Sequence, residues 1–132
     1  MIGSWTFGTA DGVPPSVAPF AHATAAGETL YVTGQMPTDL DGRLVAGGIA
    51  AQTDQVMRNL ARVLELLGGA LSDVVQARAY LLDWDEYAAF NAAYEMWFSG
   101  RRPSRTCVGV SGLAAGARVE VDLVAWRAGG WG

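Results

Sequence analysis

Lysine is absent from this chain, and histidine and cysteine each occur once, so all nine basic residues are arginines. Without a side-chain amine, no residue can form a Schiff base with a carbonyl or anchor a pyridoxal-type cofactor. A single histidine, His22, excludes a multi-histidine metal site, and a single cysteine, Cys107, excludes a cysteine zinc site and an internal disulfide. We therefore predict no metal site.

An excess of positive charge and long apolar runs are also missing. Thirteen acidic residues against nine basic ones give a net charge of −4 and a pI near 4.7, which disfavours nucleic acid as a partner. No stretch approaches the roughly 18 apolar residues of a membrane helix, and the N-terminal segment has no basic region followed by an apolar run. We expect a cytoplasmic protein that binds neither nucleic acid nor membranes.

Hydrophobic residues make up 51% of the 132 residues and charged residues only 17%, with five tryptophans among the aromatics. This composition is too apolar for a disordered chain. A chain of this length buries about two-thirds of the surface that its unfolded form exposes. We therefore expect a single domain over residues 1–132.

The hydrophobic pattern predicts six strands and two helices in the order β-β-β-α-β-α-β-β. Apolar residues three and four apart predict a helix over 49–67 that stops at Gly68, and a second apolar stripe follows Asp83 and ends near Gly100. Alternation predicts a strand in which Val75 belongs to the buried set. The last two strands, "RTCVGVS" and "RVEVDLVAW", read as a hairpin. This order favours an α+β fold, a mixed sheet with both helices on one face and another subunit against the other.

Arginines 101, 102 and 105 form the only dense basic cluster, and Arg105 lies at the start of an apolar strand. A guanidinium group held on a strand can grip a carboxylate through two parallel hydrogen bonds. The alternative is a structural arginine that pairs with Glu120 or Asp122. Arg101 and Arg102 are interpreted as solvated loop charges. The pattern leaves both interpretations of Arg105 open.

Glu120 and Asp122 are two residues apart on one strand, so their side chains share a face. A carboxylate there could orient or deprotonate a water molecule, or could form the solvated side of an ordinary strand. Cys107 shares the face of Arg105 and is typical of an inert, buried residue. His22 is interpreted as a strand residue with a satisfied hydrogen bond, and Asn91 as an amide beside the apolar stripe of the second helix.

Four segments together, "YVTGQMP", "FNAAYEMWF", "PSRTCVGVSGL" and "VEVDLVAW", resemble the RidA (YjgF-type) reactive imine deaminases over residues 16–126. The resemblance implies a chorismate-mutase-like fold that assembles as a homotrimer with pockets at the subunit interfaces. It also implies hydrolysis of short-lived enamines and imines, such as 2-aminoacrylate and 2-iminopropanoate, to a 2-keto acid and ammonia without a cofactor.

The same resemblance implies roles for single residues. Arg105 matches the carboxylate-binding arginine, and Glu120 matches a glutamate associated with the attacking water. The main chains of Gly34 and Cys107 match the pocket lining. Two further matches are Thr33, which stands where serine is frequent, and Asn91, which stands at a recurrent helix asparagine. Phe20 stands where the deaminases best known for 2-aminoacrylate carry a tyrosine, so the pocket loses a hydroxyl group.

We predict an imine or enamine deaminase that binds the carboxylate of a small 2-imino or 2-keto acid. Two alternatives stay open. One is a related activity on a larger or ring-derived imine, and the other is a non-catalytic protein that binds a metabolite carboxylate. RNA cleavage is disfavoured by the acidic balance and the absence of lysine.

Overall fold

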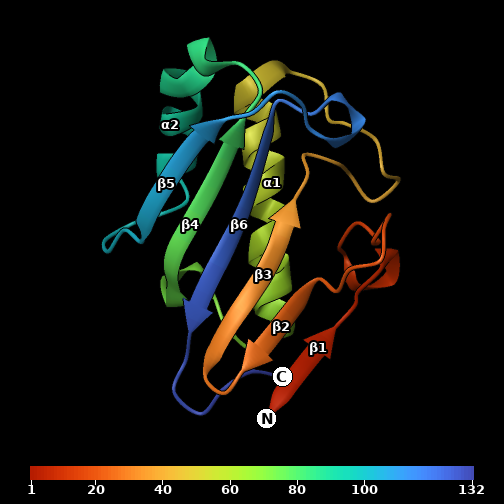
Figure 1. Cartoon of the computed structure of the whole chain (residues 1–132), viewed down its shortest axis with the longest axis vertical. Helices are drawn as coiled ribbons and strands as arrows, with labels where there is room; N and C mark the ends of the chain where they lie inside the picture. Colours follow the sequence, from red (N-terminus) through yellow and green to blue (C-terminus); the bar gives the residue numbers. More distant parts are fainter.

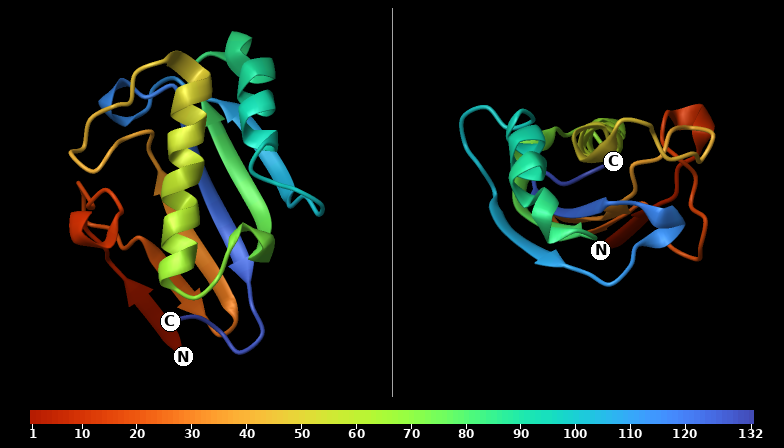
Figure 2. Two further views of the ribbon diagram at one scale, coloured as in Figure 1. Left: turned by 180° about the vertical axis from the view of Figure 1, so that it is seen from behind. Right: turned by 90° about the horizontal axis from the view of Figure 1, so that it is seen from above.

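The computed structural model describes residues 1–132, and its centre is a six-stranded mixed sheet with the strand order β1-β2-β3-β6-β4-β5 (Figure 1). Both helices lie on one face of this sheet (Figure 2). The predicted element order and α+β class are confirmed. The strands are β1 (Ile2–Trp5), β2 (Ala23–Ala26), β3 (Thr29–Gln35), β4 (Val74–Leu81), β5 (Ser104–Gly109) and β6 (Val119–Trp126), and the helices are α1 (Gly48–Leu66) and α2 (Tyr87–Glu95).

Helix α1 buries the stripe that the sequence predicts. Val56, Leu60 and Val63 are fully buried, and the helix packs against β6 and β3. The helix ends just before Gly68, whose φ of 89° lies in the left-handed region that glycine adopts at little cost. Neither helix has the length and apolar character that crossing a bilayer requires.

Strand β6 lies in the middle of the sheet, and the predicted hairpin between the last two strands is wrong. Strand β5 pairs in parallel with β4, and β4 separates it from β6. The chain passes from β4 through α2 to β5, which is the usual crossover between parallel strands. Residues 110–118 then return it to the centre. Alternation predicts which side of a strand is buried, but it does not specify the neighbouring strand.

Two local predictions also need correction. Val74 is buried and Val75 is 44% exposed, because the register with β6 shifts between Val74 and Gln76. Helix α2 ends at Glu95, earlier than predicted. At its start the side chain of Asp83 accepts a hydrogen bond from the N–H of Asp85, within a short 3₁₀ turn that precedes the helix.

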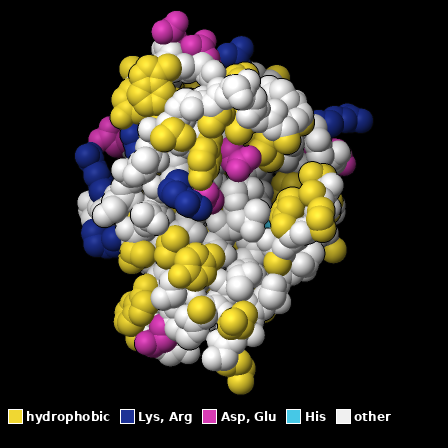
Figure 3. Space-filling view, in the orientation of Figure 1, with side chains coloured by type: hydrophobic (Ala, Val, Ile, Leu, Met, Phe, Trp, Pro, Cys, Tyr) yellow, Lys and Arg dark blue, Asp and Glu magenta, His cyan; other side chains and the backbone are white.

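The other face of the sheet has no helix over it. Large side chains that stay exposed there include Tyr31, Val108 and Trp126. Figure 3 shows hydrophobic side chains on this face around a few charged ones. The expectation that another subunit covers this face remains a prediction.

Candidate functional site

Arg105 is a residue of β5, and its side chain extends from the helix-covered face of the sheet toward α2. Its register partner on β4 is Ala77, which is fully buried beneath the helices. The guanidinium carbon lies 5.0 Å from the ring centre of Tyr94 and 5.4 Å from that of Phe90. One guanidinium N–H donates to the Tyr87 hydroxyl at 3.2 Å. Three aromatic side chains of one helix face therefore hold the cation in place.

No carboxylate forms an ion pair with Arg105, and this contradicts the alternative in which it pairs with Glu120 or Asp122. Asp122 accepts a hydrogen bond from Arg78 at 2.8 Å and another from the Tyr80 hydroxyl at 2.9 Å. Glu120 lies on the opposite face, since its register partner is Tyr80 rather than a buried residue. A half-buried cation without a counter-ion is suited to binding an anion from solution.

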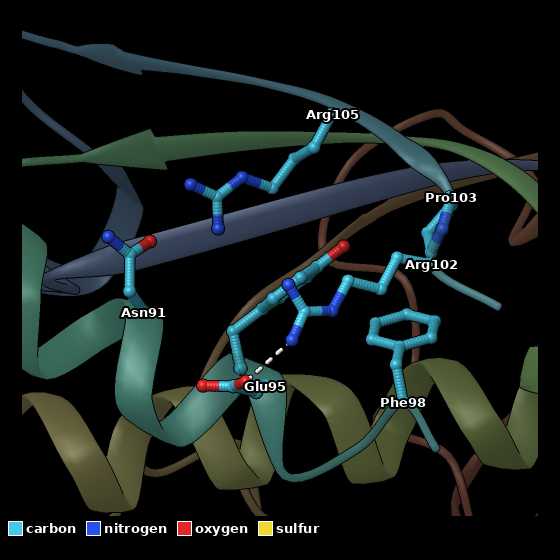
Figure 4. Close-up of a pocket in the computed structure, with 7 residues that line it drawn as sticks. Asn91, Glu95, Phe98, Arg102, Pro103 and Arg105 are labelled. Atoms are coloured by element: carbon cyan, nitrogen blue, oxygen red, sulfur yellow. Dashed lines mark hydrogen bonds and ion pairs between the residues drawn. The ribbon is translucent and has the colours of Figure 1, made fainter. Parts of the chain in front are cut away.

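A pocket of about 250 Å³ opens beside the Arg105 guanidinium group. Asn91 and Arg105 extend toward each other at one side of it (Figure 4). Two buried oxygen atoms at the pocket, Asn91 Oδ1 and Tyr94 Oη, have no hydrogen-bond partner. Such atoms are rare in proteins and indicate a place where a polar ligand can bind. The pocket is lined by Asn91, Tyr94, Glu95, Phe98, Arg102, Pro103 and Arg105.

Tyr94 and Cys107 are both affected by burial next to Arg105. Tyr94 is only 8% exposed. Burial raises the pKa of its hydroxyl and that of the Cys107 thiol, and the positive charge of Arg105 partly opposes both rises. Both groups therefore keep their protons at neutral pH, and Cys107 is not an activated nucleophile.

Glu120 and Gly34 meet on the uncovered face. Burial raises the pKa of the Glu120 carboxyl, and the negative charge of Asp122 adds to the rise. A Cβ atom at Gly34 would lie only 2.9 Å from the carboxyl carbon of Glu120, so a side chain there would require the Glu120 carboxylate to move. Gly34 also lines a second cavity, of about 130 Å³, together with Phe20.

Thr33 and His22 use their side chains within the fold. The Thr33 hydroxyl donates to the carbonyl of Ala21 at 2.6 Å. His22 is 1% exposed, its Nδ1 accepts from the N–H of Phe7 at 3.1 Å, and its Nε2 lies 2.8 Å from the carbonyl of Pro14. The predicted satisfied hydrogen bond of His22 is confirmed.

The predicted site residues form two separate groups within one chain. Arg105 and Cys107 share the face of β5 that lies toward α2, and Asn91 lies on α2 itself, whereas Glu120, Gly34 and Phe20 belong to the β3–β6 side. Strand β4 lies between β5 and β6, so two strand spacings, about 10 Å, separate Arg105 from Glu120 across the sheet. Their side chains also point to opposite faces. One small molecule cannot contact both within a single chain.

Sequence reasoning missed the hydroxyl groups of Tyr87 and Tyr94, which it assigned to an apolar stripe. Tyr87 and Tyr94 are seven residues apart and lie on one helix face, and Asn91 lies between them. The sequence does carry a signal for these two tyrosines. Their helix face includes two hydroxyl groups and one amide, and the next strand along the chain carries Arg105.

The chain matches a family model and several known proteins. The model described as Endoribonuclease L-PSP matches residues 12–127. The 3-aminoacrylate deaminase RutC of Acinetobacter baylyi is 38% identical over 87% of this chain and 92% of its own. Protein HMF1 of Saccharomyces cerevisiae is 32% identical over 95% of this chain and 97% of its own. The crystal structure of RidA from a Psychrobacter species superimposes with a TM-score of 0.85 at 31% identity, over 89% of this chain and 95% of that one.

Proposed function

The chain belongs to the L-PSP (YjgF/RidA) family, and from this membership and the unpaired Arg105 we propose that it hydrolyses short-lived 2-imino acids and enamine acids to 2-keto acids and ammonia. The observation that carries the proposal is the half-buried Arg105 without an acidic partner, beside a pocket with two unpartnered oxygen atoms. A planar guanidinium group binds a carboxylate through two parallel hydrogen bonds. Every 2-imino acid carries such a carboxylate next to the reacting carbon.

Asn91 Oδ1 complements the other polar group of such a substrate. An imine or enamine N–H can donate a hydrogen bond to this buried oxygen once Arg105 holds the carboxylate and a rotation of the Asn91 side chain exposes the oxygen to the pocket. Two fixed points orient the C=N bond and leave its carbon open to water. An imine carbon is already electrophilic, so positioning supplies a large part of the required rate increase.

We assign to Glu120 the role of taking a proton from the attacking water molecule. Water adds to the C=N carbon, and one of its protons passes through the carboxylate to the nitrogen, which gives a carbinolamine. The carboxylate then moves the hydroxyl proton of the carbinolamine to the nitrogen, and the C–N bond breaks to release ammonia as the C=O bond forms. The raised pKa of Glu120 brings it closer to neutrality, where a carboxylate transfers protons more readily than at its ordinary value.

We further propose that the working form is a homotrimer with one site at each boundary between copies. Arg105 and Glu120 lie on opposite faces of one sheet, so a complete site needs Arg105 from one copy and Glu120 from its partner. The exposed side chains of Tyr31, Val108 and Trp126 make the uncovered face suitable for such contact. Gly34 and Phe20 would then line the partner's side of the pocket.

The test is a direct assay of imine decay. An amino-acid oxidase acting on alanine or 2-aminobutyrate supplies the 2-imino acid, and its disappearance is followed with and without the purified protein. Because a relative is named for 3-aminoacrylate, that enamine acid is tested beside them. We expect decay well above the rate in buffer, and a rate equal to that of buffer for all three compounds would contradict the proposal.

The same measurement separates the two alternatives. A related activity would appear as turnover of a larger or ring-derived imine with little turnover of the small ones. A non-catalytic binding protein would show a rise in melting temperature with 2-keto acids while no imine is consumed. The matching family model is described as an endoribonuclease, but a net charge of −4 disfavours RNA as the substrate of this chain.

A further inference from the structure

The mouth of the Arg105 pocket carries an ion pair, formed by Arg102 and Glu95. Arg102 Nη2 and Glu95 Oε1 lie 2.7 Å apart, and both residues line the same pocket as Arg105 (Figure 4). Arg101 and Arg102 are both exposed and lie outside the regular elements, as their interpretation as solvated loop charges expects, but each also has a partner within the chain. Arg101 donates to the main-chain carbonyls of Ser72 and Val74. Arg102 is a second guanidinium group at the pocket.

Glu95 stands at an electrostatically unfavourable place. It is the last residue of α2, where the partial negative charge of the helix C-terminus disfavours a carboxylate. Arg102 offsets this by pairing with it. The two side chains are 72% and 60% exposed, and an ion pair this exposed contributes little to stability. The pair therefore acts on a ligand mainly through the negative charge that Glu95 places at the pocket.

Three charged side chains line the pocket: Arg105, Arg102 and Glu95. While Glu95 is paired with Arg102, Arg105 is the one cation of the pocket that has no acidic partner. Phe98 and Pro103 supply apolar surface beside the ion pair. This lining suits a ligand with one carboxylate and a short, uncharged side chain. It disfavours a second carboxylate, because such a group would have to displace Glu95 or lie close to its negative charge.

We propose that the Glu95–Arg102 pair determines the charge of the substrate, and that the enzyme acts on 2-imino monocarboxylates and discriminates against 2-imino dicarboxylates. Glu95 forms the ion pair with Arg102 that a second substrate carboxylate would otherwise form. This inference rests on the proposed function, in which Arg105 binds the first carboxylate. It adds a specificity-determining pair that lies outside the reacting atoms.

Binding of two stable 2-keto acids tests the inference without depending on turnover. Calorimetry compares 2-oxobutanoate, with one carboxylate, and 2-oxoglutarate, with two, on the wild type, Glu95→Gln, Arg102→Gln and the double variant. Since Glu95→Gln frees Arg102 and removes the competing charge, we expect the affinity for 2-oxoglutarate to rise about fivefold or more, as for a new charge-assisted hydrogen bond. The affinity for 2-oxobutanoate should change less than twofold.

The other variants are matched controls. Arg102→Gln leaves Glu95 unpaired at the mouth, so 2-oxoglutarate should bind more weakly than to the wild type. The double variant, which has neither charge, should fall below Glu95→Gln. Both substituted positions are exposed, and melting temperatures confirm that each variant folds.

The outcomes distinguish the inference from the function beneath it. An unchanged ratio of the two affinities in Glu95→Gln, with 2-oxobutanoate still bound through Arg105, would overturn the role of the pair and leave the deaminase proposal standing. Loss of the Arg105 dependence, seen as equal 2-oxobutanoate binding in Arg105→Gln, would instead overturn the proposed function.

Discussion

Two arginines on neighbouring strands have opposite surroundings. Arg78 on β4 and Arg105 on β5 differ by a single register position, since Arg105 pairs with Ala77 and Arg78 pairs with Thr106. Arg78 points to the uncovered face and is bound by Asp122 at 2.8 Å. Arg105 points under α2 and has aromatic rings and a tyrosine hydroxyl around it, but no acid.

The difference shows that the face of the sheet on which a charged side chain lies decides which groups surround it. Asp122 neutralises Arg78 through the ion pair, and its hydrogen bond and charge raise the pKa of Arg78. Arg105 keeps its charge available, at the expense of stability, because no carboxylate compensates for its partial burial. Arg78 is therefore paired with an acid within the fold, whereas Arg105 has no acidic partner there and can bind one from outside.

The largest effect is expected from replacing Arg105 by lysine. Lysine keeps the charge but loses the planar fork and the contact with Tyr87, so kcat/KM for imine hydrolysis should fall by about 100-fold or more. Arg78→Lys is the matched control, since it makes the same chemical change on the other face. Retention of activity within a few-fold in Arg105→Lys would show that the guanidinium fork does not bind the substrate.

A smaller effect is expected from Glu120→Gln, which removes the proposed proton carrier but leaves Arg105 untouched. The value of kcat should fall by about 10- to 100-fold, typical of a lost general acid–base group, while the affinity for 2-oxobutanoate stays within about twofold. Equal losses in affinity and kcat would mean that Glu120 contributes to binding rather than to proton transfer.

The same variant tests the electrostatics of Glu120 through stability. Its pKa is raised in the folded protein, so the folded state binds the proton more tightly than the unfolded state, and stability falls as pH rises above the unfolded value of about 4.3. Glu120→Gln should therefore melt at a higher temperature than the wild type near pH 7. The difference should vanish below about pH 4, where both states of the wild type are protonated.

The smallest effect on function is expected from Arg78→Gln. The change leaves Asp122 with Tyr80 as its remaining partner and should lower the free energy of unfolding by about 1 kcal/mol. The affinity for 2-oxobutanoate should stay within about twofold, as measured by calorimetry. A loss of affinity as large as that of Arg105→Lys would contradict the separation of the two faces.

Much of the fold was accessible from the sequence, but the surroundings of Arg105 were not. The spacing of Val56, Leu60 and Val63 predicts α1, and the two-residue period of β6 predicts its buried side, because both patterns depend only on local geometry. The position of Val75 could not be predicted, since it depends on a register shift against β6. The unpartnered hydroxyl of Tyr94 was equally inaccessible, because an apolar stripe does not show which atoms lack a partner.

The order of the elements, the α+β class and the use of arginine as the sole strong cation can be derived from the sequence, because they follow from residue types and short-range periods. The folded chain was needed to show that β4 separates β5 from β6 and that Arg105 and Glu120 lie on opposite faces. It also brought Glu95 to Arg102 at the pocket mouth. Strand pairing and side-chain partners arise from contacts between distant segments, and the local pattern of a chain does not contain them.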